Sequence, residues 1–248
     1  MLNKNLIQIN SEINNKIKDL KYKDYSPKII AVSKTFGMDK IKPLIDLGHT
    51  DFGENKVQEA VEKWTKVKNQ NIKLHFIGKL QTNKVKYTIP LFDFIHSLDN
   101  EKLAKKIAEE QKKINKQLKI FIQINLGNEN QKAGITPSIS KSFYNYCKND
   151  LNLNIIGTMC LPPFSENPEP YFKKLFEINN SLELKEISMG MSDDYLMAIK
   201  YKSTYLRIGS KIFGKRDQKI WIFEFLLISL QTIIKSFLLS AIHPKVGL

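Results

Sequence analysis

The stretch KIIAVSK, residues 28–34, is a short apolar run that ends in a serine and a lysine. Seven further runs of similar length follow it, and longer segments with the apolar spacing of helices separate them. They are HTDFGE at 49–54, KLHFIG at 73–78, FDFIHSL at 92–98, KIFIQINL at 119–126, NIIGTMC at 154–160, EISMGM at 186–191 and TYLRIG at 204–209. Because near-continuous apolar strands alternate with helices, the pattern predicts a parallel sheet whose outer face is covered.

The alternation predicts an α/β fold, a single (β/α)8 TIM barrel. Such barrels take roughly 200–250 residues, and this chain has 248. A doubly wound open sheet has the same alternation of elements and is also compatible with the pattern. Residues 1–20 carry apolar side chains at helical spacing among lysines, which predicts an extra N-terminal helix rather than a signal peptide. We therefore expect a cytoplasmic protein.

The composition narrows the class of partner. With 42% hydrophobic and 26% charged residues, the chain is neither disordered, collagen-like nor a multi-span membrane protein. A net charge of +14 attracts anions, but the lysines are spread among acidic residues and no groove-reading motif is present, so we expect no nucleic-acid partner. Cys147 and Cys160 are too far apart for a metal or redox motif and are expected in the core. The histidines share no metal-ligand spacing, so no metal site is expected.

Lys34 is the first candidate functional residue. Active sites of TIM barrels lie at the C-terminal ends of the strands, and Lys34 closes the first predicted strand. Partial desolvation at the barrel mouth would lower the pKa of its amine and make it a nucleophile toward carbonyl carbon. On position alone, a lysine that simply caps a strand is the ordinary interpretation.

Two segments near the other end of the chain indicate a phosphate site. In MGMSDD at 189–194 and RIGSKIFG at 207–214, small residues lie where a strand gives way to a helix, an arrangement that binds anions. TIM barrels commonly hold phosphate in the loops after strands seven and eight. An ordinary helix cap explains either segment alone. Opposite a lysine that can form an imine, the pair indicates pyridoxal 5′-phosphate (PLP).

Arg207 would then lie beside the cofactor ring, since it is on the last predicted strand, two residues before Gly209. An always-charged arginine can only donate hydrogen bonds, so it would leave the pyridine nitrogen unprotonated and suppress quinonoid chemistry. The alternative is a structural ion pair of Arg207 with Asp193 or Asp194.

Five segments in chain order carry a family resemblance: AVSKT at 31–35, FGENKVQE at 52–59, LHFIGKLQTNK at 74–84, ISMGMSDD at 187–194 and STYLRIGSKIFGKR at 203–216. Together they resemble the pyridoxal phosphate homeostasis protein family, over roughly residues 1–216. The resemblance implies a PLP-binding barrel similar to the N-terminal domain of alanine racemase and to fold-type III decarboxylases. The cofactor-binding residues that it implies are Lys34, Asn55, Met191, Ser192, Arg207, Gly209 and Ser210.

The resemblance also implies their roles. Lys34 carries the cofactor as an internal aldimine, and Arg207 faces the pyridine nitrogen. The phosphate is contacted by Ser192, Gly209 and Ser210, with the Met191 amide assisting. Asn55 lies beside the ring near the lysine.

We expect a cofactor carrier rather than an enzyme. Related racemases use two bases on opposite faces of the cofactor, the second supplied by an additional β domain, for which residues 217–248 leave no room. The expected role is to hold PLP as a lysine aldimine, maintain intracellular PLP homeostasis and deliver the cofactor to apoenzymes, with no catalytic residues. The alternative is a PLP-dependent amino-acid racemase or decarboxylase of fold type III.

For three further residues, the sequence allows two possible roles each. Lys84 and Lys132 lie on loops at the mouth side, either as solvated lysines or as second amines that receive the aldehyde during transfer. His75 is expected to be a packed, hydrogen-bonded histidine rather than an acid or base.

The C-terminal segment departs from the resembled family, whose members usually end soon after the segment that matches IFGKR. We divide the chain into a PLP-binding barrel, 1–216, and an apolar C-terminal helical extension, 217–248. Residues 220–242 are long and apolar enough to suggest a membrane span, but Glu224, Gln231 and Lys235 form a polar stripe at helical spacing. A helix docked on the barrel or on a partner subunit, an interfacial membrane helix, a marginal span and a frameshift or readthrough artefact all fit. Docking or artefact is the favoured interpretation.

Cell fractionation tests the interpretation of this extension. We expect both the full chain and a chain that ends at Arg216 to be recovered in the soluble fraction, because a docked helix needs no bilayer. Recovery of the full chain with membranes, and release of the shortened chain, would show that the extension is a membrane helix.

Overall fold

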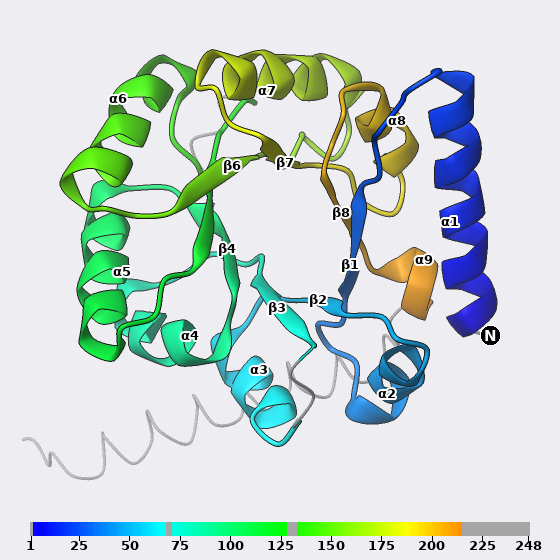
Figure 1. Ribbon diagram of the computed structural model, residues 1–248, viewed down its shortest axis with the longest axis horizontal. Helices are drawn as coiled ribbons and strands as arrows, with labels where there is room; N and C mark the ends of the chain where they lie inside the picture. The colour runs from blue at the N-terminus through cyan, green and yellow to red at the C-terminus, as the bar shows by residue number, and fades with distance from the viewer. Residues whose placement is uncertain (1, 68–70, 128–132, 215–248) are drawn as a thin grey trace, which may run out of the picture. The chain divides into compact units, whose positions relative to one another are not determined.

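The computed structural model describes residues 2–67, 71–127 and 133–214, and its eight strands form one closed parallel barrel in chain order (Figure 1). The strands are β1 (Lys28–Val32), β2 (Asp51–Glu54), β3 (Lys73–Phe76), β4 (Phe94–Leu98), β5 (Lys119–Gln123), β6 (Ile155–Met159), β7 (Glu186–Ser188) and β8 (Tyr205–Ile208). The barrel prediction is confirmed, and the open sheet is wrong because β1 pairs with β8 as well as with β2. Each strand lies within its predicted run.

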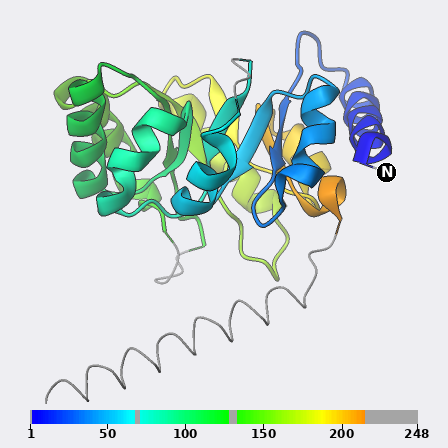
Figure 2. The same cartoon turned by 90° about the horizontal axis from the view of Figure 1, so that it is seen from below.

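Helices surround the barrel on its outer side (Figures 1 and 2). They are α1 (Leu2–Asp19), α2 (Met38–Asp46), α3 (Val57–Trp64), α4 (Val85–Leu91), α5 (Glu101–Ile114), α6 (Ser140–Asn145), α7 (Glu169–Ser181), α8 (Tyr195–Lys200) and α9 (Ser210–Phe213). Two 3-10 turns, η1 (Thr82–Lys84) and η2 (Pro137–Ile139), and a π-helical turn, η3 (Tyr146–Asp150), complete the described elements. The predicted N-terminal helix is confirmed as α1.

Helix α5 shows how the sequence sets the helix layer. Leu103, Ala104 and Ile107 recur at helical spacing and are fully buried against the sheet. The Asn100 side chain accepts a hydrogen bond from the Leu103 N–H at 2.8 Å, an N-cap that contributes about 1 kcal/mol. Asn115, in the left-handed conformation, ends the helix.

The core has two parts because successive strand residues point to opposite faces. On β8, for example, Leu206 and Ile208 pack against the helices, whereas Tyr205 packs inside the barrel. The apolar residues of the interior are Ile30, Phe94, Phe121, Met159 and Tyr205. Buried polar residues also lie on the interior positions of the strands, and they matter for the site.

Helix α1 docks on α8 and α9, the last described helices (Figure 1). Glu12 on α1 accepts hydrogen bonds from the Tyr195 hydroxyl and from the Lys211 ammonium, the latter at 2.9 Å. The Asn5 side chain donates to the Ile212 carbonyl at 2.9 Å. The hydrogen bond from Tyr195, with that from Lys211, lowers the pKa of Glu12 to about 2.

The chain beyond Gly214, including the predicted extension 217–248 and the segment 220–242, lies outside the described residues. Within residues 2–67, 71–127 and 133–214, no helix combines the length and the apolar character needed to cross a bilayer.

We predict that Glu12→Gln lowers the free energy of unfolding by about 1 kcal/mol at pH 7, the size of a partly exposed charge-assisted contact. A carboxyl whose folded-state pKa is depressed stabilises the fold above its unfolded value of 4.5, and this contribution is lost as the pH falls toward 2. The difference between the two proteins in urea unfolding should therefore shrink across that interval. Exposed Glu177→Gln is the control, and a pH-independent difference would contradict the assignment.

Candidate functional site

The predicted site residues lie together at one side of the barrel mouth. Lys34 follows β1, Asn55 follows β2, and Ser192 lies in the loop after β7. Gly209 follows β8 directly and precedes α9. Since β1 pairs with β2 and β8, and β8 pairs with β7, these ends belong to four neighbouring strands.

Lys34 is half-buried, and the backbone on both sides of it is held in place. The buried Ser33 N–H donates to the Gly53 carbonyl at 3.0 Å. Thr35 adopts the left-handed conformation, with φ of 69°, and its N–H donates to the Glu59 carboxylate. A non-glycine residue in this region is uncommon and is maintained only by its surroundings. Here it turns the chain immediately after the lysine.

A buried carboxylate, Glu54, ties the end of β1 to helix α3. Its Oε1 accepts from the Ser33 hydroxyl at 2.7 Å and from Trp64 Nε1 at 3.1 Å, and it forms an ion pair with Lys63 at 2.7 Å. Lys63 Nζ also donates to the Ser33 carbonyl at 3.0 Å. Burial raises the pKa of Glu54, and the Lys63 charge opposes this effect. The cluster anchors the strand end that carries Lys34.

Asn55 is placed by a close backbone approach. A Cβ on Gly78, at the end of β3, would lie 2.1 Å from the Asn55 carbonyl oxygen, so only glycine fits there. The Asn55 Oδ1 atom is buried and has no hydrogen-bond partner in the described part of the chain. A buried polar atom without a partner is destabilising, so this oxygen can accept a hydrogen bond from a group outside the chain.

The loop after β7 and the turn after β8 converge on the Ser192 hydroxyl. Its oxygen accepts from the Gly209 N–H at 3.2 Å and from the Lys211 N–H at 3.4 Å. Gly190, with φ of 90°, makes the turn that begins this loop, and its carbonyl accepts from the Arg207 N–H at 2.9 Å. Ser210 is the first residue of α9.

The Met191 N–H already has a partner, because it donates to the Asp194 side chain. To assist a phosphate, as the sequence predicts, this amide would have to exchange that partner for the anion.

Arg207 is 4% exposed and lies inside the barrel near the mouth. Its guanidinium donates to the Ser188 hydroxyl at 2.6 Å and to the Cys160 carbonyl at 2.9 Å. These acceptors are uncharged, whereas the sequence-based alternative was a direct ion pair with Asp193 or Asp194. Burial lowers the pKa of Arg207, and the nearby Asp194 charge opposes this shift.

Sequence reasoning missed several polar residues that support the site. Glu54 lies in a predicted strand end, and nothing in the sequence connects it with Lys63 or Trp64. His75 is packed and hydrogen-bonded, as predicted, and lies inside the barrel, but the sequence does not indicate its hydrogen bond with His96. No periodicity in the sequence marks such links, because each joins residues of different strands or helices.

The remaining predicted positions are accounted for as follows. Cys147 and Cys160 are buried, as predicted. Lys84 is hydrogen-bonded to the Gln58 side chain at 3.3 Å, and Lys132 lies outside the described residues. In residues 2–67, 71–127 and 133–214, no group of three or more His, Cys, Asp or Glu side chains could hold a metal.

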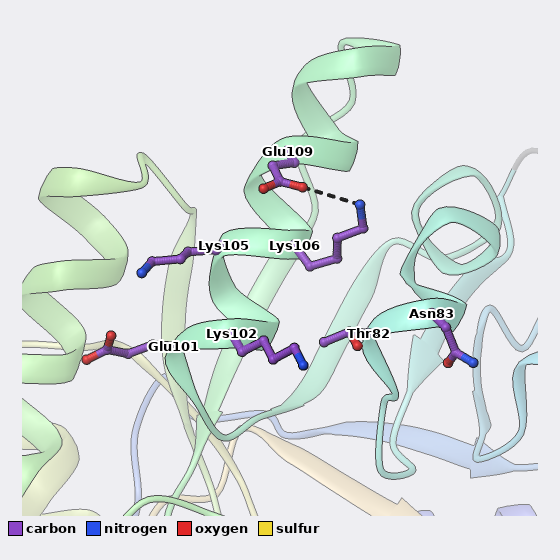
Figure 3. Close-up of a pocket in the computed structure, with 7 residues that line it drawn as sticks. All are labelled: Thr82, Asn83, Glu101, Lys102, Lys105, Lys106 and Glu109. Atoms are coloured by element: carbon purple, nitrogen blue, oxygen red, sulfur yellow. Dashed lines mark hydrogen bonds and ion pairs between the residues drawn. The ribbon is translucent and has the colours of Figure 1, made fainter.

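A separate groove of about 710 Å³ lies in the outer helix layer between η1 and α5 (Figure 3). Its lining includes none of the predicted site residues, and its Lys106 pairs with Glu109 at 3.2 Å and with Glu110 at 2.9 Å. Alternating lysines and glutamates of this kind form a solvated helix face, so the groove is not the candidate site. The lining residues are Thr82, Asn83, Glu101, Lys102, Lys105, Lys106 and Glu109.

Comparisons with known proteins show the family of this chain. Residues 10–217 match the family described as "Alanine racemase, N-terminal domain". A pyridoxal phosphate homeostasis protein of Aquifex aeolicus is 39% identical over 76% of this chain and 87% of its own length. Another, of Pasteurella multocida, is 36% identical over 87% of this chain and 98% of its own. The chain belongs to the pyridoxal phosphate homeostasis protein family.

A solved structure supports the same conclusion. PipY of Synechococcus elongatus, determined with PLP bound, superposes with a TM-score of 0.72 and 28% identity. The match covers 82% of this chain and 100% of that one.

We predict that Gly190→Ala destabilises the protein by about 2–4 kcal/mol in urea unfolding, from backbone strain together with overpacking. Its Cβ would lie 2.7 Å from the Ala198 Cβ. Gly48→Ala is the matched control, because Gly48 also has a positive φ, 82°, but open space around a Cβ. Equal losses in the two variants would show that the loop after β7 is not held closely against α8.

Proposed function

We propose that this chain binds PLP through Lys34 as a Schiff base, keeps it masked in the cytoplasm, and delivers it to apoenzymes as part of intracellular PLP homeostasis. The observation that carries the proposal is the placement of three features on neighbouring strand ends. They are the half-buried residue Lys34, the buried residue Arg207, and the two loops that meet at Ser192. The relatives' names and the PLP bound to PipY support the same cofactor.

The residues present fit the cofactor at each of its polar groups. Ser192 and Ser210 offer hydroxyl groups for the phosphate. The Gly209 N–H donates to Ser192 at 3.2 Å and the Met191 N–H donates to Asp194, so each would exchange that partner for the anion. The buried Asn55 Oδ1, which lacks a partner among the described residues, would gain one from the ring side. When bound, the cofactor supplies an aldehyde carbon with which the lysine amine condenses.

The presence of Arg207 favours a protein that binds the cofactor over an enzyme that uses it in catalysis. A guanidinium is a donor at every nitrogen, so it cannot accept a proton from the pyridine ring and cannot keep that nitrogen protonated. Its two protein acceptors, Ser188 and the Cys160 carbonyl, carry no negative charge to offset it. A ring whose nitrogen stays unprotonated withdraws electrons weakly, which disfavours racemisation and decarboxylation.

The second candidate function is an amino-acid racemase or decarboxylase of fold type III, which the barrel favours as a fold. A screen of amino acids for PLP-dependent turnover separates the two candidates. Rates typical of enzymes, roughly 1–1,000 per second, would overturn the carrier proposal.

We predict that purified protein with PLP has the absorption band of a protonated imine, and that borohydride fixes the cofactor on the peptide containing Lys34. Lys34→Ala should abolish both, because it removes the amine to which the proposal assigns the imine. The exposed Lys40→Ala is the control and should retain both. A fixed cofactor on another lysine, with the band intact in Lys34→Ala, would contradict the assignment.

A further inference from the structure

A line of polar side chains crosses the interior of the barrel from its base to the site. Asp51 Oδ1 and His75 Nε2 are 3.0 Å apart, and His75 Nδ1 lies 3.0 Å from His96 Nε2. His96 Nδ1 lies 2.8 Å from the Ser188 hydroxyl, which accepts from Arg207 Nη1 at 2.6 Å. We call these five residues the polar chain. It spans five strands, β2, β3, β4, β7 and β8, and ends at the residue that the proposed function places beside the cofactor ring.

All hydrogen bonds of the polar chain point in the same direction, with each residue donating to the next from Arg207 to Asp51. Arg207 can only donate, so the Ser188 oxygen accepts from it and the Ser188 hydroxyl proton goes to His96 Nδ1. His96 therefore carries its proton on Nε2 and donates it to His75 Nδ1. His75 in turn donates from Nε2 to the Asp51 carboxylate.

The reverse direction is disfavoured by charge. It would need either a protonated Asp51 or a doubly protonated His75 in an interior that already holds an arginine. Burial lowers the pKa of both histidines, and the neighbouring His75 and Arg207 lower the pKa of His96 further. Two neutral rings, each with its proton on Nε2, satisfy every nitrogen.

Packing fixes the two rings in this orientation. His75 stacks on Phe94 with ring centroids 4.1 Å apart, and His96 stacks on Phe121 at 4.3 Å. Both histidines and Ser188 are fully buried. Asp51, the first residue of β2, keeps 14% of its side chain exposed at the base. The carboxylate is thus the only member besides Arg207 that carries charge in this arrangement, and the two charges stand at opposite ends of the polar chain.

We propose that Ser188, His96, His75 and Asp51 are positioning residues that hold the Arg207 guanidinium in place for the cofactor ring, with the two histidines neutral. This inference rests on the proposed function and deepens it. An arginine side chain loses considerable rotamer freedom when it is ordered, and the polar chain orders it before the ligand arrives. Its contact acceptor is a hydroxyl rather than a carboxylate, so the positive charge remains available to the ring.

The first test needs no cofactor. Long-range ¹H–¹⁵N NMR spectra of the cofactor-free full chain should show His75 and His96 as neutral Nε2–H tautomers at pH 7, assigned through His75→Gln and His96→Asn. Ser188→Ala should disturb the His96 signals, because it removes the hydroxyl from Nδ1. A cationic ring or an Nδ1–H tautomer at either position would overturn the proposal.

The second test measures PLP binding through the imine absorption band. Ser188→Ala and His96→Phe should each weaken apparent binding roughly ten-fold, the effect expected when a hydrogen bond to a charged group is lost. His96→Asn keeps a polar atom near the Nδ1 position and should recover most of this affinity. Because both substitutions break the same chain, the double variant Ser188→Ala with His96→Phe should bind no more weakly than Ser188→Ala alone.

Thr158→Val is the matched control. Thr158 is equally buried on a strand, and its hydroxyl donates to Asn179 at 2.9 Å on the helix side of the sheet, away from Arg207. It should lower stability without weakening PLP binding. Binding in Ser188→Ala and His96→Phe equal to that in Thr158→Val, or additive losses in the double variant, would overturn the proposal.

The two tests separate this inference from the proposed function. Absence of the imine band in the unsubstituted protein would refute the proposed function. The histidine tautomers of the cofactor-free chain would still show whether the hydrogen bonds of the polar chain have the stated direction. A normal band with unaltered affinity in Ser188→Ala would remove the positioning role and leave the proposed function intact.

Discussion

The pairing of β1 with β8 is the constraint on which the rest of the structure depends. It joins the first strand to the last in parallel register, with Ile30 opposite Arg207 and Ala31 opposite Ile208. Without this pairing both strands would be exposed edges with unsatisfied backbone groups. The same pairing brings Lys34 close to the turn at Gly209, although the two lie near opposite ends of the described chain. The pairing that closes the barrel therefore also brings the two sides of the candidate site together.

The interior of this barrel contains more polar side chains than is common in TIM barrels. TIM barrels commonly fill this space with branched aliphatic residues, but here two histidines, a serine and an arginine share it with three aromatic rings. Buried polar groups destabilise a fold unless each finds a partner. The stacking of each histidine on a phenylalanine, together with the hydrogen bonds between strands, compensates for that cost and leaves one defined arrangement.

The sequence predicted the strand–helix alternation and the mouth loops well, because both depend on local patterns. KIIAVSK and TYLRIG have the apolar content of buried strands, and the glycines and serines that follow β7 and β8 mark the turns. The partners of Glu54 and the route from Asp51 to Arg207 could not be predicted, since they depend on which side chains face each other across strands. The engagement of the Met191 amide by Asp194 likewise depends on one side-chain rotamer.

The contacts of α1 bear on the order of events during synthesis. Tyr22 and Tyr25, just after this helix, donate their hydroxyl protons to the carbonyls of Lys200 and Ser203, and Glu12 binds Lys211. Helix α1 and the residues just after it thus have their partners among the last residues of the barrel, and such distant contacts slow folding. A nascent chain carries Lys34 long before the strand that bears Arg207 exists. Under the proposed function, the residues that would make Lys34 selective for PLP come together only once β8 has formed, so an incomplete chain would lack them.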